Sequence, residues 1–252
     1  MTSPSSPSIL RAARQYWSDI AAGSGRVRAT RLLFSAVWEF LRESTPDHLR
    51  ARFGDAEYDW DHRVNTTSGA VGWRDRLLGT FYSAYQPTEP AAFHEMLDTL
   101  EEAALQTSAN FNFRDFTFVD LGSGKGRTLL MASDYPFHRI FGVELLPSLH
   151  RIAQENVGLY KNAAQRCFAI ESVCGDATMW PIPDEPLVIY LFNPFPETPL
   201  RQVIARLEES RRAHPRPIYV LYHNPLLRHV LEESGAWRKV AAGEQFAAYA
   251  GL

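Results

Sequence analysis

The residues whose types and spacing could do chemistry gather in the stretch FTFVDLGSGKGRTLL, at positions 116–130. An apolar run carries an acid, Asp120, and is followed by three alternating glycines and a second apolar run. Glycine permits left-handed backbone and a close approach of the chain to a ligand. The stretch therefore predicts a strand, a turn that binds a nucleotide-like ligand, and a helix whose first N–H groups face that ligand.

Three kinds of ligand are bound by glycine turns of this general type. A phosphate-binding loop of the GxxxxGK[ST] type is excluded, because Lys125 is followed by Gly126 rather than by Ser or Thr. The dinucleotide fingerprint GxGxxG fits imperfectly, since the third glycine falls one residue early and Arg127 takes its place. An NAD-dependent oxidoreductase therefore stays open as an alternative.

Asp120 favours the third kind of ligand, S-adenosylmethionine. Its carboxylate lies two residues before the first glycine and would repel a pyrophosphate by like charge. S-adenosylmethionine carries an ammonium and a sulfonium and has no phosphate. The glycines would let the backbone approach its amino-acid and ribose parts, and the N–H groups of the next helix could bind its carboxylate.

Two further acids stand at the ends of the next two expected strands. Glu144 lies 24 positions after Asp120, and a carboxylate there can accept both ribose hydroxyls, as in dinucleotide-binding folds. Asp176, in the stretch CGDA, could accept from an adenine amino group. Acids at three successive strand ends, together with the glycine turn, support a single ligand site.

The elements that must position these residues follow a regular alternation. Strands are expected at 116–122, 139–145, 168–176, 186–193 and 217–224, two more within 237–252, and helices at 126–135, 147–164, 199–214 and 225–234. This alternation predicts a doubly wound α/β sheet with helices on both faces. Such sheets bind ligands at the carboxyl ends of their strands, where the acids stand.

The first 89 residues have a different character and are expected to form an N-terminal helical extension and cap that selects the substrate. Helical spacing is present at 9–22 and 28–44, and a helix at 89–105 begins the second domain, 90–252. Residues 52–75 are rich in aromatic side chains and show no clear period, which predicts a long ordered loop. Tyr58, Trp60 and Trp73 there either belong to a substrate lid or pin the loop to the core.

Composition narrows the partners. The chain has 252 residues and a net charge of -3, so no basic excess announces nucleic acid, which is expected to be an unlikely partner. No apolar stretch approaches the roughly 20 residues of a membrane span, no membrane partner is expected, and the N-terminus lacks a signal peptide. A cytoplasmic enzyme is therefore expected. The sequence contains no cluster of Cys and His residues that would indicate a metal site, so no metal is expected. The oligomeric state stays open.

The stretches VDLGSGKG, GVEL, CGDA and YLFNPF together resemble the class I S-adenosylmethionine-dependent methyltransferases, over residues 90–252. The resemblance implies a mostly parallel seven-stranded sheet whose last strand is antiparallel. It also implies S-adenosylmethionine as the cofactor. The cofactor contacts that it implies are Asp120, Gly122, Ser123, Gly124, Gly126, Glu144, Leu145, Asp176 and Ala177.

The stretch FYSAYQPTEP is similar to the segment before the core in some seven-stranded protein lysine methyltransferases. This similarity implies that Tyr85, Pro87 and Thr88 border the cofactor. In the alternative interpretation, Tyr82 and Tyr85 pack on the core, and the prolines set up the following helix.

The stretch YLFNPFPE resembles the [DN]PP[YF] motif of amine-directed methyltransferases, although its second proline is displaced. The resemblance implies that Asn193, next to the cofactor, and the backbone at Pro194 accept protons from the target nitrogen. Phe195 would then favour the developing positive charge. The alternative is a β-turn in which Asn-Pro ends the strand.

The expected function is therefore methyl transfer from S-adenosylmethionine to an amine nitrogen of a protein lysine or a small molecule. Methylation of a small-molecule oxygen is the main alternative. An oxygen nucleophile would need a general base. His223, at the next strand end, is the best candidate for that base, and His94 is the second.

Overall fold

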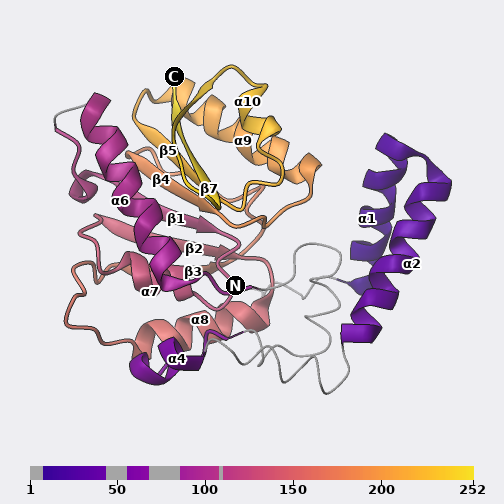
Figure 1. Cartoon of the computed structure of the whole chain (residues 1–252), viewed down its shortest axis with the longest axis horizontal. Helices are drawn as coiled ribbons and strands as arrows, with labels where there is room; N and C mark the ends of the chain where they lie inside the picture. Colours follow the sequence, from indigo (N-terminus) through magenta and orange to yellow (C-terminus); the bar gives the residue numbers. More distant parts are fainter. Residues whose placement is uncertain (1–7, 44–55, 68–85, 108–109) are drawn as a thin grey trace.

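The structure is a computed structural model, and it describes residues 8–43, 56–67, 86–107 and 110–252. Its centre is a seven-stranded sheet with the order β3-β2-β1-β4-β5-β7-β6 (Figure 1). The strands are β1 Thr117–Leu121, β2 Arg139–Glu144, β3 Ile170–Cys174, β4 Leu187–Leu191, β5 Ile218–His223, β6 Trp237–Ala242 and β7 Phe246–Gly251. β1 to β5 are parallel, and β7 runs antiparallel between β5 and β6. The predicted fold class and the antiparallel last strand are thus confirmed.

Helices cover both faces of this sheet. They are α6 Pro90–Thr107, α7 Arg127–Ala132, α8 Pro147–Leu159, α9 Glu197–Ala213 and α10 His229–Glu232, and a short 3-10 turn, Phe113–Asp115, precedes β1. Every residue of β1 and β4 is buried, because both faces of these central strands are covered. The sequence accordingly shows unbroken apolar runs there rather than alternation.

Two hydrophobic cores lie on opposite faces of the sheet. On one face, Phe118 of β1 and Tyr190 of β4 pack with Phe93 of α6. On the other face, Ile189 of β4 packs with Leu200 of α9. Successive side chains of one strand thus enter different cores. A slip of one residue would place each side chain in the wrong core, so the register of the strands is fixed and their ends meet at one edge.

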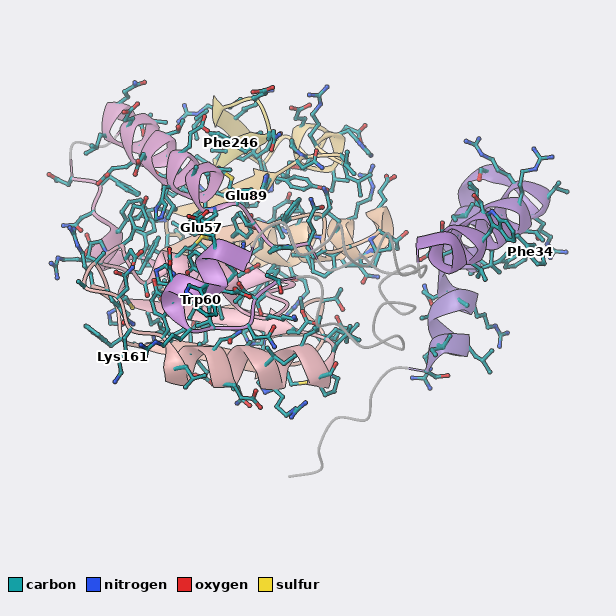
Figure 2. The ribbon with its side chains drawn as sticks, turned by 60° about the horizontal axis from the view of Figure 1, so that its bottom comes forward. Phe34, Glu57, Trp60, Glu89, Lys161 and Phe246 are labelled. Carbon is teal, nitrogen blue, oxygen red and sulfur yellow. The ribbon has the colours of Figure 1, made fainter. Side chains whose placement is uncertain are left out.

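The N-terminal region contains three described helices, α1 Ile9–Ser24, α2 Arg26–Glu43 and α4 Ala56–His62. α1 and α2 form a hairpin beside the sheet (Figure 1), and Ala12 of α1 packs with Leu146 and Leu149. Phe34 of α2 stays exposed (Figure 2). Among the described residues, no helix is both long and apolar enough to cross a membrane.

The expectation of a long loop without helix over 52–75 is wrong for its first half, because α4 occupies Ala56–His62. Its sequence, AEYDWDH, lacks an apolar period, and contacts with the core take the place of that period. Tyr58 packs against the core of Phe118 and Tyr190 and against a smaller cluster of Val64, Leu130 and Tyr160, whereas Trp60 projects from α4 and is exposed (Figure 2). Tyr58 is therefore a packing residue rather than part of an open lid. Trp73 lies outside the described residues.

Candidate functional site

The glycine turn follows β1 and lies against the end of β2. The backbone N–H groups of Gly122 and Ser123 donate to the Val143 carbonyl at 2.8 and 3.2 Å. Gly122, Gly124 and Gly126 have φ values of 96°, 55° and 83°, which is left-handed backbone that side chains other than glycine rarely adopt. The alternating glycines are thus explained by the path of the turn itself.

Glu144, at the end of β2, holds the inner side of this turn. One carboxylate oxygen accepts from the Gly124 N–H and the other from the Leu146 N–H, both at 2.8 Å. Each carboxylate oxygen can accept more than one hydrogen bond, so the buried Glu144 can still accept from a ligand hydroxyl. The predicted ribose acceptor therefore also shapes the turn, which the sequence did not indicate.

Asp120, at the end of β1, is buried, and the Thr128 hydroxyl of α7 donates to its carboxylate. Burial raises the pKa of Asp120 to about 7; the Thr128 hydrogen bond opposes the rise, and the Glu144 charge adds to it. A cation beside this carboxylate would stabilise the charged form. The site thus favours a ligand with an ammonium group over one with a pyrophosphate.

The other predicted cofactor residues follow β2 and β3 or pack inside the turn. The exposed Asp176 accepts from the Thr178 N–H and hydroxyl at 2.8 and 2.7 Å, which forms a local turn and leaves its second carboxylate oxygen for a ligand. Ser123 lies against β2, because a Cβ placed on Gly142 would come within 2.6 Å of the Ser123 hydroxyl. The predicted Leu145 and Ala177 are half-buried next to these positions.

The turn after β4 carries the predicted acceptor-side residues. Asn193 has a left-handed φ of 45°. Its side-chain N–H donates to the Asn224 carbonyl at 2.6 Å, and its Oδ1 accepts from the Tyr222 hydroxyl at 3.0 Å. Residues other than glycine in left-handed backbone cluster at functional sites. The two bonds fix the direction of the Asn193 amide at this edge of the sheet.

The two turns touch at Gly122 and Pro194. A Cβ built on Gly122 would lie 2.5 Å from the Cβ of Pro194, closer than real Cβ atoms come to another atom. Phe195, the next predicted residue, is half-buried and packs against the core on the α9 face. The contact places the end of β4 directly against the glycine turn.

A buried chain of hydrogen bonds lies beneath this edge. The Tyr190 hydroxyl bonds to the Thr88 hydroxyl at 2.8 Å and to Nδ1 of His223 at 2.9 Å. The His223 ring stacks on Phe192 with a centroid distance of 4.1 Å. Burial lowers the pKa of His223, and a hydrogen bond to the Gln245 side chain opposes this change. His223 is therefore neutral and held on both sides.

Two predicted positions lie away from this edge or outside the described residues. Tyr85 lies outside the described residues, whereas Pro87 is half-buried next to Thr88. The second candidate base, His94, bonds to the Tyr135 hydroxyl at 3.0 Å. Tyr135 lies in the connection that leads into the start of β2, so His94 is not at the carboxyl ends of the strands.

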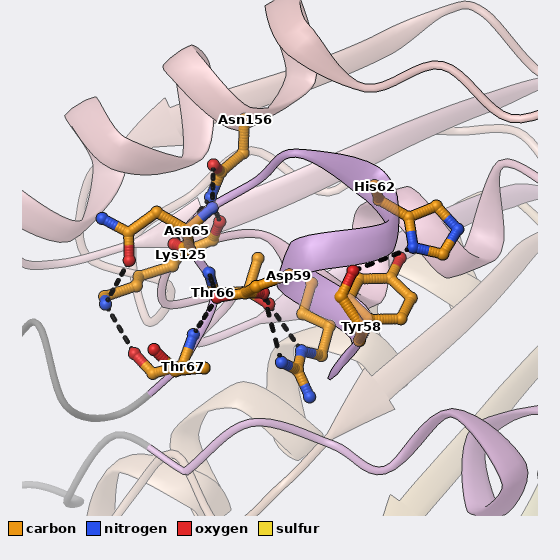
Figure 3. Close-up of polar contacts among 9 residues, drawn as sticks. Tyr58, Asp59, His62, Asn65, Thr66, Thr67, Lys125 and Asn156 are labelled. Carbon is orange, nitrogen blue, oxygen red and sulfur yellow. Dashed lines mark hydrogen bonds and ion pairs between the residues drawn. The ribbon is translucent and has the colours of Figure 1, made fainter. Parts of the chain in front are cut away.

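Sequence reasoning missed four residues that shape the site. Tyr190 and Tyr222 are hydroxyl-bearing residues in otherwise apolar strands, a signal that was present in the sequence. Lys125 and Arg127 stand in or next to the glycine motif, yet both are buried. Lys125 points toward Thr67 of the N-terminal region (Figure 3), and Arg127 donates to Thr66. Their partners are about 60 residues earlier in the chain, which no local pattern indicates.

The strand order β3-β2-β1-β4-β5-β7-β6, with an antiparallel last strand, is the arrangement that the resemblance to the class I S-adenosylmethionine-dependent methyltransferases implies. No protein-family model and no curated protein matches the sequence.

Similar solved structures exist at low identity. An RNA methyltransferase from Salinibacter ruber, in complex with S-adenosyl-L-homocysteine, is 20% identical, with a TM-score of 0.42 over 66% of this chain and 92% of its own. A human methyltransferase 10 domain containing protein is 14% identical, with a TM-score of 0.49 over 82% and 97%. A predicted N6-adenine-specific DNA methylase from Listeria monocytogenes is 17% identical, with a TM-score of 0.42 over 66% and 51%.

The expectation that nucleic acid is an unlikely partner is wrong. The similar structures include the RNA methyltransferase and the predicted DNA methylase named above. A net charge of -3 averages over the whole chain, whereas nucleic acid is recognised by local surfaces. Overall charge therefore does not exclude nucleic-acid acceptors for this fold.

Proposed function

We propose that this protein is an S-adenosylmethionine-dependent methyltransferase that transfers the methyl group to an amine nitrogen. The observation that carries the proposal is the contact between Gly122 and Pro194, which joins the glycine turn to the turn of Asn193. A methyltransferase needs its cofactor and its acceptor to meet at such a junction.

The residues at the edge of the sheet fit this cofactor. Asp120 would bind the ammonium, because a cation beside its carboxylate relieves the unfavourable burial of that charge. The left-handed glycines would admit the methionine and ribose parts, and Glu144 would accept from the ribose hydroxyls. Asp176, with one oxygen not engaged by Thr178, would accept from the adenine amino group. S-adenosylmethionine, when bound, supplies a methyl group activated by a positively charged sulfur.

An amine acceptor suits the groups that follow β4. The Asn193 Oδ1 accepts one hydrogen bond from Tyr222 and has a second lone pair for an acceptor N–H. A neutral amine needs orientation rather than a strong base, and its surplus proton can leave to solvent after transfer. The acceptor class that we favour within this proposal is a protein lysine or a small-molecule amine.

Methylation of an oxygen is the less favoured candidate. It would need a general base within reach of the acceptor hydroxyl. His223 is neutral, as a base must be, but it is buried, and Tyr190 and Gln245 both bond to it. These contacts suit a residue that supports the sheet edge better than one that takes a proton from substrate.

We further propose that residues 1–89 select the acceptor, as the division at residue 89 predicts. The segment 56–67 supports this, because it packs directly onto the glycine turn through Lys125 and Arg127.

Titration calorimetry with S-adenosylmethionine, S-adenosylhomocysteine and NAD tests the cofactor. We expect micromolar binding of the two sulfur compounds, loss of binding in Asp120→Ala, and no change in Asp115→Ala, an exposed acid just before β1. Binding of NAD alone would place the protein among the oxidoreductases instead. Transfer of labelled methyl to lysine peptides, small amines, hydroxyl compounds and oligonucleotides then identifies the acceptor.

A further inference from the structure

Two cations inside the glycine motif are turned away from the ligand edge. Lys125 and Arg127 are 0% and 2% exposed. A buried charge is strongly unfavourable unless hydrogen bonds and opposite charges compensate it. The partners of these two cations therefore show what the motif is attached to.

Both cations bind the segment that follows α4 (Figure 3). The Lys125 ammonium donates to the Thr67 carbonyl at 2.6 Å and to the Asn65 side-chain oxygen at 3.1 Å. The Arg127 Nε donates to the Thr66 hydroxyl at 2.6 Å, and its guanidinium pairs with Asp59 at 3.3 Å. The segment Asn65–Thr67 is thus anchored by the residues that alternate with and follow the last glycines.

Asp59 gives this segment its shape as well as its charge. Its carboxylate accepts from the backbone N–H groups of Thr66 and Thr67 at 2.6 and 2.8 Å, and from the Thr66 hydroxyl. The same carboxylate pairs with Arg127. One acid therefore folds the segment back on α4 and neutralises a cation of the glycine motif.

Asn156 of α8 joins the two backbones from a third side. Its Oδ1 accepts from the Asn65 N–H at 2.8 Å, and its N–H groups donate to the Asn65 and Lys125 carbonyls at 3.0 and 2.9 Å. Asn156 is itself buried, so loss of any of these bonds would leave an unsatisfied polar group. The glycine turn is therefore held outside by Asn156 and the segment, and inside by Glu144.

Cation–π, stacking and apolar contacts complete the attachment of the segment to the glycine turn. The Arg127 guanidinium lies over the Tyr58 ring, 4.8 Å from its centroid, and Tyr58 stacks on His62. Val64 packs with Leu130 of α7. These contacts seal the polar bonds from water, where they would be weaker.

From this arrangement we infer that Asp59 and Asn65–Thr67 form a clasp that holds the glycine turn in its ligand-binding conformation, with Lys125 and Arg127 as positioning residues. The inference rests on the proposed function, since the ligand is the cofactor bound by that turn. Glycines lose more backbone freedom on ordering than other residues, and three of them lie in this turn. If the turn is already ordered before the ligand binds, binding does not have to restrict the glycine backbone, so the clasp raises cofactor affinity.

Thermodynamic linkage makes the coupling between the clasp and the ligand reciprocal. If opening of the clasp weakens ligand binding by a given factor, bound ligand must disfavour opening by the same factor. The N–H groups of Asn65, Thr66 and Thr67 report opening, because their acceptors are Asn156 and Asp59. Their hydrogen exchange in the whole 252-residue chain therefore measures the coupling directly.

The test compares Lys125→Met with the matched control Arg201→Met, which removes two exposed ion pairs, to Glu197 and Glu233. We expect Kd for S-adenosylhomocysteine to rise about tenfold in Lys125→Met and to stay unchanged in the control, within the range typical of coupling between sites. In the wild type, saturating S-adenosylhomocysteine should slow exchange of the three clasp amides by a similar factor. A purely structural role would lower the melting temperature and leave both quantities unchanged.

An unchanged Kd in a folded Lys125→Met overturns the clasp alone. If that variant does not fold, exchange in the wild type decides: clasp amides unaffected by ligand overturn the inference, and slowed exchange supports it. Failure of the wild type to bind either sulfur compound overturns the proposed function, and with it the inference that rests on it. The two failures are thus distinguishable.

Discussion

The two halves of the ligand edge are held together differently. In the half formed by β1 and β2, buried charged side chains bond to the backbone, since Glu144 accepts from two N–H groups and Lys125 donates to a carbonyl. In the half formed by β4 and β5, the Asn193 side chain is oriented by another side chain as well as by backbone, since it accepts from the Tyr222 hydroxyl and donates to the Asn224 carbonyl. A half made of fixed backbone suits one invariable cofactor. A half made of oriented side chains suits recognition of a particular acceptor.

The strongest way to break this comparison is Gly122→Ala, at the contact between the halves. The new Cβ would overlap Pro194 at 2.5 Å and would sit on a backbone with φ of 96°. Strain and overpacking of about 2 kcal/mol each would together weaken cofactor binding roughly 1,000-fold. Calorimetry with S-adenosylhomocysteine measures this change.

Gly158→Ala is the matched control for that prediction. Gly158 lies in α8, has ordinary helical φ, and a Cβ there meets nothing within 4 Å. Alanine should stabilise the helix by about 1 kcal/mol and leave the Kd unchanged. Equal affinity in Gly122→Ala and Gly158→Ala would show that the junction is not part of the ligand site.

Asn193→Gly separates the two halves functionally. Glycine keeps the left-handed backbone at φ 45° and removes only the amide that Tyr222 and Asn224 orient. We expect the rate of methyl transfer to fall about 100-fold, because a misplaced acceptor loses its alignment, while the Kd for S-adenosylhomocysteine stays within about twofold.

Asn224→Gly controls for that substitution, because it also lies at a left-handed position and retains the carbonyl that Asn193 binds. Its rate should stay close to that of the wild type. A comparable loss of cofactor affinity and rate in Asn193→Gly would mean that the acceptor half also binds the cofactor.

Much of this edge was predictable because its determinants are local. The apolar runs, the glycines and the acids at strand ends are each contained within a few residues, and strand register brings the ends together. The positions of Asp120, Glu144 and Asn193 at the ends of β1, β2 and β4 thus follow from the sequence. The fold class follows from the alternation of strands and helices.

The clasp was not predictable, because its determinants are distant in the chain. Lys125 and Thr67 are 58 positions apart, and nothing within the motif indicates that Lys125 is buried. α4 was missed for the same reason, since Tyr58 and Asp59 are held by α7 and its flanking turn rather than by an apolar helix period. Tertiary contacts here override local propensity.

Glu144→Gln sharpens the account of the cofactor half. An amide has one acceptor oxygen, so either the Gly124 N–H or the Leu146 N–H would face an NH₂ group. A buried donor without an acceptor costs about 1–3 kcal/mol, which predicts roughly 30-fold weaker binding of S-adenosylhomocysteine. Glu171→Gln, on the exposed face of β3, should leave the Kd unchanged, and a similar loss there would refute the role given to Glu144.

The smallest effect that we expect is a pH dependence of stability and of cofactor binding, which comes from Asp120. Burial raises the pKa of Asp120 from 3.8 to about 7. Between these values the folded protein without ligand holds a proton that the unfolded chain has lost, so the free energy of unfolding falls as pH rises through this window. Asp120→Asn should flatten that part of the stability curve in denaturant titrations.

Ligand binding should show the opposite trend. An ammonium beside Asp120 stabilises the carboxylate, so binding expels the proton below pH 7, and affinity should rise about tenfold between pH 6 and 8. Calorimetry at pH 6 in buffers of different ionisation enthalpy counts the released proton, and Asp120→Asn should release none. Proton uptake, or release unaffected by Asp120→Asn, would remove Asp120 from the cofactor half and leave Glu144 as the buried acid there.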